Sequence, residues 1–250
     1  MSSTYVYGIA AAEHPSLPDG MDGIGKPARP VRIVKEGPLA AIVSEAPDDL
    51  RPKRRDLLAH QNVLAEAGAG GSVLPMRFGS LAPDEKAVAD ALAERVDHYR
   101  ERLRALDGKV EYNVKAQHDE EAVLHRVLAE NPDVRALTDA NRKAGGGTYE
   151  ERLRLGETVV GAVQAREAQD AAELRQLLEE AADAVSTGPE STGWLANLSF
   201  LVDRESAGRF LAAVEEIRGD RSHIQLTVNG PLPPYSFVEP GPSAPADGTQ

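Results

Sequence analysis

Histidines are the residues of this chain best suited to metal binding or acid–base chemistry, and the sequence holds six of them (His14, His60, His98, His118, His125 and His223). His118 and His125 are seven positions apart with three acids between them, so two helical turns place both imidazoles on one face if the helix includes His118. That arrangement is compatible with a metal site. A solvated helix start, with acids in its first turn, is the favoured interpretation. We therefore predict no bound metal.

Other residues that could take part in catalysis or ligand binding are no better placed. The chain has no cysteine, which excludes disulfides, thiolate metal sites and a cysteine nucleophile. Gly145, Gly146 and Gly147 precede a predicted helix, where free N–H groups can cradle an anion. They lack a preceding strand and the spacing of a phosphate-binding loop, so a flexible connector is favoured. No serine lies in the glycine pattern of a nucleophile elbow. The sequence predicts neither an enzyme nor a cofactor.

The charge of the chain limits its partners. A net charge of −12 opposes binding to nucleic acid and to anionic membranes. The one dense basic run, Arg51-Pro-Lys-Arg-Arg55, is interpreted as a solvated helix start. No run approaches the roughly 20 apolar residues that span a bilayer, and the N-terminus lacks the features of a signal peptide. We expect a cytoplasmic protein with no nucleic acid and no membrane among its partners.

The first predicted domain covers residues 1–107 and has an α+β fold. Apolar and β-branched runs predict strands over residues 4–11, 31–35, 39–44 and, ended by Pro75, 72–78. Leu57, Leu58 and Leu64 predict the buried face of a helix over residues 53–67. One longer helix is expected up to Leu106, because its apolar residues recur at intervals of three and four (Val88, Leu92, Val96, Tyr99, Leu103 and Leu106).

A second domain is predicted over residues 108–238. Val110, Tyr112, Val114 and Ala116 alternate with polar residues, which indicates a strand with one wet face. Further strands are expected over residues 194–202 and 223–228, and helices over 119–130, 133–140, 148–185 and around 210–217. Strand, helices, strand, helix, strand is a partial ferredoxin-like order with one strand missing or supplied by another segment.

A helical hairpin over about residues 119–187 is predicted inside the second domain. The long helix carries Leu174 and Leu178 in an a/d pattern, and it must cover that stripe with another element. The preceding helix offers the nearest apolar partners (Val123, Leu124, Val127 and Leu128). We therefore expect an antiparallel hairpin that projects from the sheet.

A proline-rich segment closes the ordered part of the chain. Asn229-Gly230 predicts a turn, and Pro231, Pro233 and Pro234 then favour a stiff extended segment that presents Tyr235 and Phe237. Docking of these two aromatics onto the protein itself is favoured over contact with a partner. Residues 239–250 are expected to be a disordered tail.

Arg77 and Phe78 form a second weak candidate for docking. They lie in Pro75-Met-Arg-Phe-Gly79, where an arginine between large apolar residues can hold carbonyls or a carboxylate. A structural role is favoured over an interaction role for Arg77.

Five motifs in order give the chain a family resemblance. They are Tyr5-Val-Tyr-Gly-Ile9, Val73-Leu-Pro-Met-Arg-Phe-Gly79, Tyr149-Glu-Glu-Arg-Leu-Arg-Leu-Gly-Glu157, Asn197-Leu-Ser-Phe-Leu-Val-Asp-Arg-Glu205 and the segment from Asn229 to Val238. Together they resemble the gas vesicle protein F/L family. The resemblance implies an α+β fold of two domains, the second a modified ferredoxin-like domain with a long helical hairpin.

The resemblance also implies a function. It points to a non-enzymatic minor structural component or assembly factor of gas vesicles, which binds the shell protein and other gas vesicle proteins at the vesicle in the cytoplasm. A small-ligand-binding regulatory module of ferredoxin-like type is the alternative, because fold alone does not determine function. The sequence leaves open whether the chain is F-like or L-like, which face contacts the shell protein, and whether the chain self-associates.

Overall fold

The computed structural model describes residues 3–14, 17–189 and 193–239. Its internal contacts divide the chain into two compact units. The first unit joins the N-terminal residues up to Glu111 with the C-terminal segment that begins at Pro231, and the second unit runs from Tyr112 to Gly230. This division differs from the predicted domains at the C-terminal end, where we had assigned residues 231–238 to the second domain.

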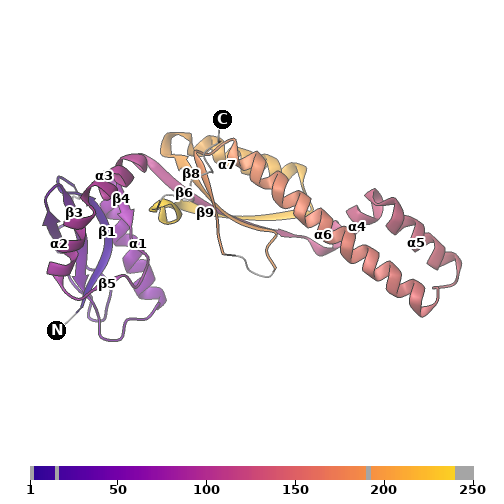
Figure 1. Ribbon diagram of the computed structural model, residues 1–250, viewed down its shortest axis with the longest axis horizontal. Coiled ribbons are helices and arrows are strands. Elements are labelled where there is room, and N and C mark those ends of the chain that lie inside the picture. Colours follow the sequence, from indigo (N-terminus) through magenta and orange to yellow (C-terminus); the bar gives the residue numbers. More distant parts are fainter. Residues whose placement is uncertain (1–2, 15–16, 190–192, 240–250) are drawn as a thin grey trace, which may run out of the picture. The chain divides into compact units, whose positions relative to one another are not determined.

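The first unit is an α+β structure built on a five-stranded sheet (Figure 1). Its strands are β1 (Thr4–Ala11), β2 (Arg32–Glu36), β3 (Leu39–Glu45), β4 (Val73–Pro75) and β5 (Leu81–Ala82). The strand order is β2-β3-β1-β4, and β5 also pairs with β1. The pairings of β1 with β3, β4 and β5, and of β2 with β3, are antiparallel. The helices are α1 (Arg54–Ala69), α2 (Glu85–Glu94) and α3 (Val96–Ala105).

Two fully buried tyrosines organise the core of the first unit. The Tyr5 hydroxyl lies 2.9 Å from His60 Nδ1, and the Tyr7 hydroxyl accepts a hydrogen bond from the Ile24 amide, also at 2.9 Å. Because β1 is the central strand, these hydroxyls tie it to α1 and to the loop before β2. Burial raises the pKa of both tyrosines, so the hydroxyls stay protonated.

The second unit contains a four-stranded sheet of order β7-β8-β6-β9. Its elements are β6 (Lys109–His118), α4 (Glu120–Glu130), α5 (Pro132–Lys143), α6 (Tyr149–Glu179), β7 (Ala184–Thr187), β8 (Ala196–Asp203), α7 (Ala207–Asp220) and β9 (Ile224–Leu232). The core side chains of β6 alternate as predicted, because Tyr112, Val114 and Ala116 are buried. Glu111, expected on the wet face, is buried instead.

The helical hairpin of the second unit has an apolar seam between α6 and the two shorter helices. Val123, Val127 and Val134 are buried there, and they pack against the first half of α6 (Leu155, Val159, Ala162 and Val163). The hairpin thus extends beyond the sheet, as Figure 1 shows. Leu174 and Leu178, which we expected in this seam, are fully buried nearer the C-terminal end of α6, between Asp170 and Glu179.

Local chemistry sets the ends of α6. Thr148 forms a capping box: its side chain accepts from the Glu151 amide, and the Glu151 carboxylate accepts from the Thr148 amide. The helix ends at Glu179, whereas we predicted helix to residue 185. Residues beyond the end form β7, which supplies the strand that the predicted order lacked. β-Branched Val185 and Thr187 favour that strand.

Three other predicted elements differ from the structure. The predicted single helix up to Leu106 is two helices, α2 and α3, separated at Arg95. In α1 the buried face is formed by Asp56, His60, Val63, Leu64 and Ala67, while Leu57 and Leu58 are exposed. The predicted turn at Asn229-Gly230 is absent, because β9 continues through it to Leu232.

None of the helices within the described residues is long and apolar enough to cross a membrane. The predicted tail over residues 239–250 lies, apart from Glu239, outside the described residues.

Candidate functional site

The predicted aromatic anchors lie on the first unit. A 3-10 turn spans Tyr235–Phe237, so the segment is not extended to its end as we predicted. Tyr235 packs against the core cluster that includes Tyr5 and Tyr7, with its ring 6.4 Å from that of His60. Burial raises the pKa of Tyr235 to about 12, and Phe237 is only 8% exposed.

Polar contacts hold the same segment in place. The Glu111 carboxylate, buried on β6, accepts from the backbone amide and from the hydroxyl of Ser236, each at 2.8 Å. Arg102 on α3 donates to the carbonyl oxygens of Phe237 and Val238 at 2.7 and 3.1 Å. These four bonds explain why the segment belongs to the first unit, and why Glu111 is buried despite its charge.

Arg77 and Phe78 lie after β4 and differ in burial. Phe78 packs partly buried against the same core cluster, with its ring 5.8 Å from that of Tyr5. Arg77 is exposed, and within the described residues its guanidinium has no hydrogen bond or ion pair. Its carbonyl oxygen accepts from the amide and hydroxyl of Ser80, which shapes the turn before β5. The structure therefore brings Phe78 and Tyr235 to one cluster and leaves Arg77 in solvent.

A buried carboxylate in the second unit forms the densest polar network. Asp170 on α6 has no exposed side-chain surface. Its Oδ2 atom lies 2.9 Å from Nε2 of His118 and 2.9 Å from Nε2 of His223. Arg166, one turn earlier, donates to both carboxylate oxygens at 2.9 and 2.6 Å. Burial alone raises the pKa of Asp170, but these hydrogen bonds outweigh it and lower the pKa to about 2.

The network resembles a metal-ligand set in composition, since two imidazoles and a carboxylate converge within 4.8 Å. Its hydrogen bonds do not fit a metal ion. Arg166 occupies both oxygens of Asp170, and Arg126 Nη1 lies 3.2 Å from Nδ1 of His223. Because a guanidinium can only donate, Nδ1 is an acceptor and Nε2 carries the proton that Asp170 accepts. A ligating imidazole needs that nitrogen free.

This network was not predicted from the sequence. His118 was weighed as a metal ligand beside His125, but His125 is exposed and faces Glu121. One signal for Asp170 was present in the sequence, because Asp170, Leu174 and Leu178 recur at intervals of four and so share the buried face of α6. An acid in that stripe indicates a paired buried charge.

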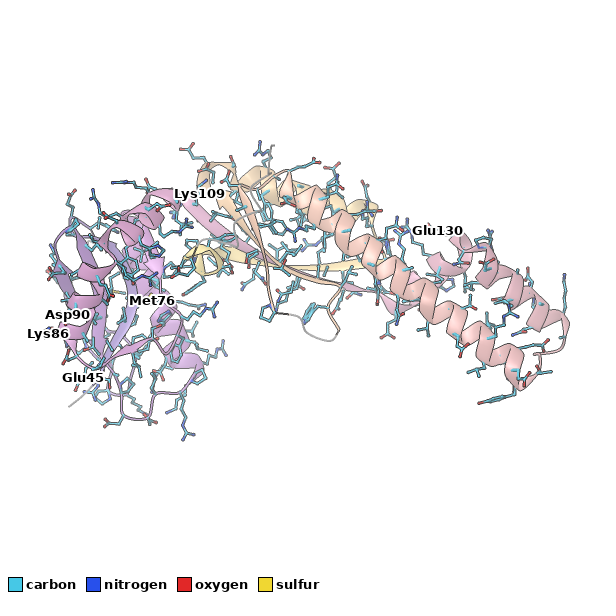
Figure 2. All side chains as sticks on the ribbon, in the orientation of Figure 1. Glu45, Met76, Lys86, Asp90, Lys109 and Glu130 are labelled. Atoms are coloured by element: carbon cyan, nitrogen blue, oxygen red, sulfur yellow. The ribbon has the colours of Figure 1, made fainter. Side chains whose placement is uncertain are left out.

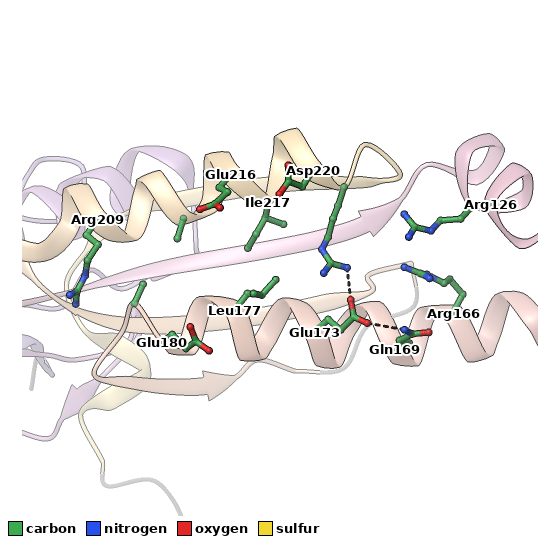
Figure 3. Close-up of a pocket in the computed structure, with 13 residues that line it drawn as sticks. Arg126, Arg166, Gln169, Glu173, Leu177, Glu180, Arg209, Glu216, Ile217 and Asp220 are labelled. Carbon is green, nitrogen blue, oxygen red and sulfur yellow. Dashed lines mark hydrogen bonds and ion pairs between the residues drawn. The ribbon is translucent and has the colours of Figure 1, made fainter. Parts of the chain in front are cut away.

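A cavity of about 720 Å³ lies between α6 and α7 (Figure 3). At one end its arginines are already paired: Arg221 donates to Glu173, and Arg166 to Glu130 and Asp170. Glu130 closes α4 and is labelled in Figure 2. Glu173 also accepts from Gln169, as Figure 3 shows. Four arginines and four acids line the whole cavity, so its lining carries no excess of either sign.

An exposed apolar stripe runs along the first half of α6. Tyr149, Leu153 and Val160 are 73%, 50% and 56% exposed. Gly156 and Gly161 lie beside them with nothing within 4 Å of a would-be Cβ. The two glycines leave a shallow, open depression on this face of the helix, lined by residues of α6 alone. We call Tyr149, Leu153 and Val160 the α6 stripe.

Comparison with known proteins identifies relatives over almost the full chain. Residues 3–239 match the family model described as Gas vesicle synthesis protein GvpL/GvpF. Gas vesicle protein F of Streptomyces sp. (strain CB03234) is 66% identical over 237 residues, which cover 95% of this chain and 100% of that protein. Gas vesicle protein L of the same strain is 29% identical over 256 residues, which cover 94% and 92%. The similarity to the F relative is the greater of the two.

Solved structures agree with the fold. The crystal structure of the gas vesicle protein GvpF from Anabaena sp. PCC7120 matches with a TM-score of 0.76 at 24% identity, covering 96% of this chain and 99% of that one. GvpF from Microcystis aeruginosa matches with a TM-score of 0.70, also at 24% identity, covering 96% and 100%. At this identity the likeness shows the α+β fold alone.

Proposed function

The chain belongs to the GvpL/GvpF family of gas vesicle synthesis proteins, and on that premise we propose that it is a non-enzymatic assembly factor or minor structural component of gas vesicles. It binds the vesicle shell protein and other gas vesicle proteins, and it acts at the vesicle in the cytoplasm. It needs no cofactor or metal for this role. Its net charge of −12 keeps it in solution beside an apolar partner.

The fold of the second unit supports this proposal because it leaves one face of the hairpin uncovered. The order strand, helices, strand, strand, helix, strand, with sheet order β7-β8-β6-β9, follows the ferredoxin-like arrangement with a helical hairpin inserted after its first strand. We infer a modified ferredoxin-like domain. The hairpin places the first half of α6 outside the core, and one face of that half is uncovered.

The α6 stripe is the observation that carries the proposal. Its three large apolar side chains are each at least half exposed, although removing apolar surface from water is favourable. A neighbouring hollow at Gly156 and Gly161 lets another helix or strand approach closely. Contact with an apolar face of the shell protein accounts for both features. Arg77 and Phe78 offer a second, smaller contact on the first unit, while Tyr235 and Phe237 dock on the protein itself.

A co-expression experiment tests the proposal. Shell protein is produced with the wild-type chain, with Leu153→Glu and Val160→Glu together, or with Leu58→Glu, and the fraction of shell protein that stays soluble and co-purifies is measured. Leu58 is a matched control because it is 53% exposed on α1 of the other unit. We expect the wild type and the control to retain shell protein and the double variant to lose it. Equal retention by all three would place the contact elsewhere.

The small-ligand alternative finds little support in the cavity between α6 and α7. The arginines at one end of it are bonded to Glu130, Asp170 and Glu173, so a ligand must first break these pairs. A metabolite that raises the melting temperature of the purified chain in a saturable way, where shell protein does not, would favour this alternative.

A further inference from the structure

The Asp170 network joins the helical hairpin to the sheet of the second unit. Asp170 and Arg166 lie on α6, and Arg126 lies on α4. His118 is the last residue of β6, and His223 directly precedes β9. The contact from Arg126 to His223 is thus a direct polar bond between the first hairpin helix and the start of an edge strand.

The hydrogen bonds determine the protonation state of His223. Its Nδ1 accepts from Arg126 at 3.2 Å and its Nε2 donates to Asp170 at 2.9 Å, so the ring is neutral. A second proton has only Nδ1 to occupy. The resulting N–H would point at the guanidinium of Arg126, which turns a hydrogen bond into a contact between two cations.

Arg126 has a second partner besides His223. Its Nε lies 2.9 Å from Glu130, one turn further along α4. Loss of the His223 contact therefore leaves Arg126 paired within its own helix. Polar contacts of α4 with this strand then persist at its N-cap, where Asp119 donates its amide to the His223 carbonyl oxygen and accepts from Gln225.

The other charged groups around His223 do not reverse this outcome. On α6, Asp170 attracts a proton on His223, but its oxygens already accept from Arg166 and from His118. Arg221, which follows α7, lies 3.8 Å from Asp170 and is bonded to Glu173. Two guanidinium groups, those of Arg166 and Arg221, thus lie at the carboxylate next to the ring, and a third, that of Arg126, lies at the ring itself.

The surroundings of His118 differ from those of His223. Its buried Nδ1 has no hydrogen-bond partner among the described residues, and the carboxylate of Glu167 lies 4.0 Å away. A carboxylate, and not a guanidinium, thus lies behind this nitrogen. The two imidazoles bond the same oxygen of Asp170 but differ in what lies behind them.

We propose that His223 is a proton-sensitive catch that holds the middle of α4 to the start of β9 when neutral and releases Arg126 when protonated, which loosens α4 beyond its N-cap. Burial lowers the pKa of His223 below its ordinary value of 6.5, and the hydrogen bond to Asp170 offsets this only in part. For a base with a lowered folded-state pKa, the unfolded chain binds more protons. The catch is therefore fully engaged above about pH 6.5 and weakens as the pH falls below it.

The test measures amide exchange of α4 at about pH 7.5 and about pH 5, corrected for the intrinsic exchange rate, on three full-length chains. His223→Gln keeps both bonds, because its amide nitrogen donates to Asp170 and its oxygen accepts from Arg126, but it cannot take the proton. His118→Gln is the matched control on the other imidazole. We expect protection of α4 to fall at least several-fold on acidification in the wild type and in His118→Gln, and to stay constant in His223→Gln.

Two results would overturn the proposal. One is an unchanged α4 in the acidified wild type, and the other is an equal loss of protection in His223→Gln. If His223→Gln fails to fold, the nitrogen chemical shifts of the wild-type imidazole test the proposal, because they report its tautomer and charge. We expect the Nε2–H tautomer of His223 at neutral pH, and a charged ring or the Nδ1–H tautomer there would contradict the catch.

Discussion

Ser236 donates both its backbone amide and its hydroxyl to the buried carboxylate of Glu111, each over 2.8 Å. The two residues are 125 positions apart in the chain, and Glu111 is only 3% exposed. This pair therefore fastens the C-terminal segment to the end of the first unit, beside the aromatic contacts of Tyr235.

Truncation tests that fastening. A chain that ends at Val238 keeps Ser236 and Phe237, so its melting temperature should match that of the wild type. A chain that ends at Gly230 leaves Glu111 without its partner and uncovers the cluster around His60. We expect a loss of about 3 kcal/mol or more in the free energy of unfolding, from a charged acceptor left unpaired plus the lost aromatic burial.

Ser236→Ala gives a finer version of the same measurement. It removes one of the two donors and keeps the backbone amide, so denaturant unfolding should show a loss of about 1–2 kcal/mol. Identical melting temperatures and solubility for the two truncated chains would mean that the segment does not stabilise the first unit, and that its aromatics serve a partner.

Two substitutions on α6 should separate the hairpin from the core of the second unit. Leu178→Ala removes a fully buried side chain and should cost about 2–5 kcal/mol, with faster amide exchange across the whole unit. Val159→Ala acts in the seam with α4 and α5, and it should cost about 1 kcal/mol or less and loosen only the hairpin. Equal acceleration in β6 by both variants would show that hairpin and sheet unfold together.

Acid should weaken the second unit through Asp170. The carboxyl has a folded-state pKa of about 2 against an ordinary value of 3.8. A lowered pKa stabilises the fold above the unfolded value, and that stability is lost as the pH falls from about 4 towards 2. At about 1.4 kcal/mol per unit this amounts to roughly 2 kcal/mol.

Asp170→Asn should remove that part of the acid response. It should also lower stability at neutral pH by about 3 kcal/mol, because an amide cannot satisfy Arg166 and both imidazoles. Asp139→Asn, at an exposed acid paired with Arg142, is the control and should change neither quantity. If Asp170→Asn loses as much stability as the wild type when the pH falls from about 4 towards 2, the low pKa of Asp170 is contradicted.

The α6 stripe should be dispensable for folding. Leu153→Glu and Val160→Glu place charges at positions that are already exposed. The free energy of unfolding should therefore change by no more than about 0.5 kcal/mol, and the melting temperature should shift only slightly. Binding of shell protein, measured on the same preparations, should fall at least tenfold. A strongly destabilised double variant would show instead that the stripe packs within the protein.

The regular elements were predictable because their periodicity is local. Alternation in β6, and the spacing of Phe210, Val214 and Ile217 in α7, each specify a buried face without reference to any other segment. The break at Arg95 and the end of α6 at Glu179 were not predictable in this way, because the apolar pattern continues past both points.

The polar networks were beyond sequence reasoning for a different physical reason. His118, Asp170 and His223 lie 52 and 53 positions apart, and only the fold brings them together. The exposed face of α1 was predicted wrongly for the same reason. Asp56 and His60 are buried by bonds to distant groups, which turns Leu57 and Leu58 outward.

Vesicle formation in cells tests the central claim most directly. The gene is deleted in a vesicle-forming cell, and the number of vesicles is counted after return of the wild type, of the Leu153→Glu, Val160→Glu double variant, or of Leu58→Glu at equal protein levels. We predict few or no vesicles in the deletion strain, full rescue by the wild type and by Leu58→Glu, and little rescue by the double variant. Normal vesicles in the deletion strain would contradict a role in assembly, and full rescue by the double variant would contradict the α6 stripe as the contacting surface.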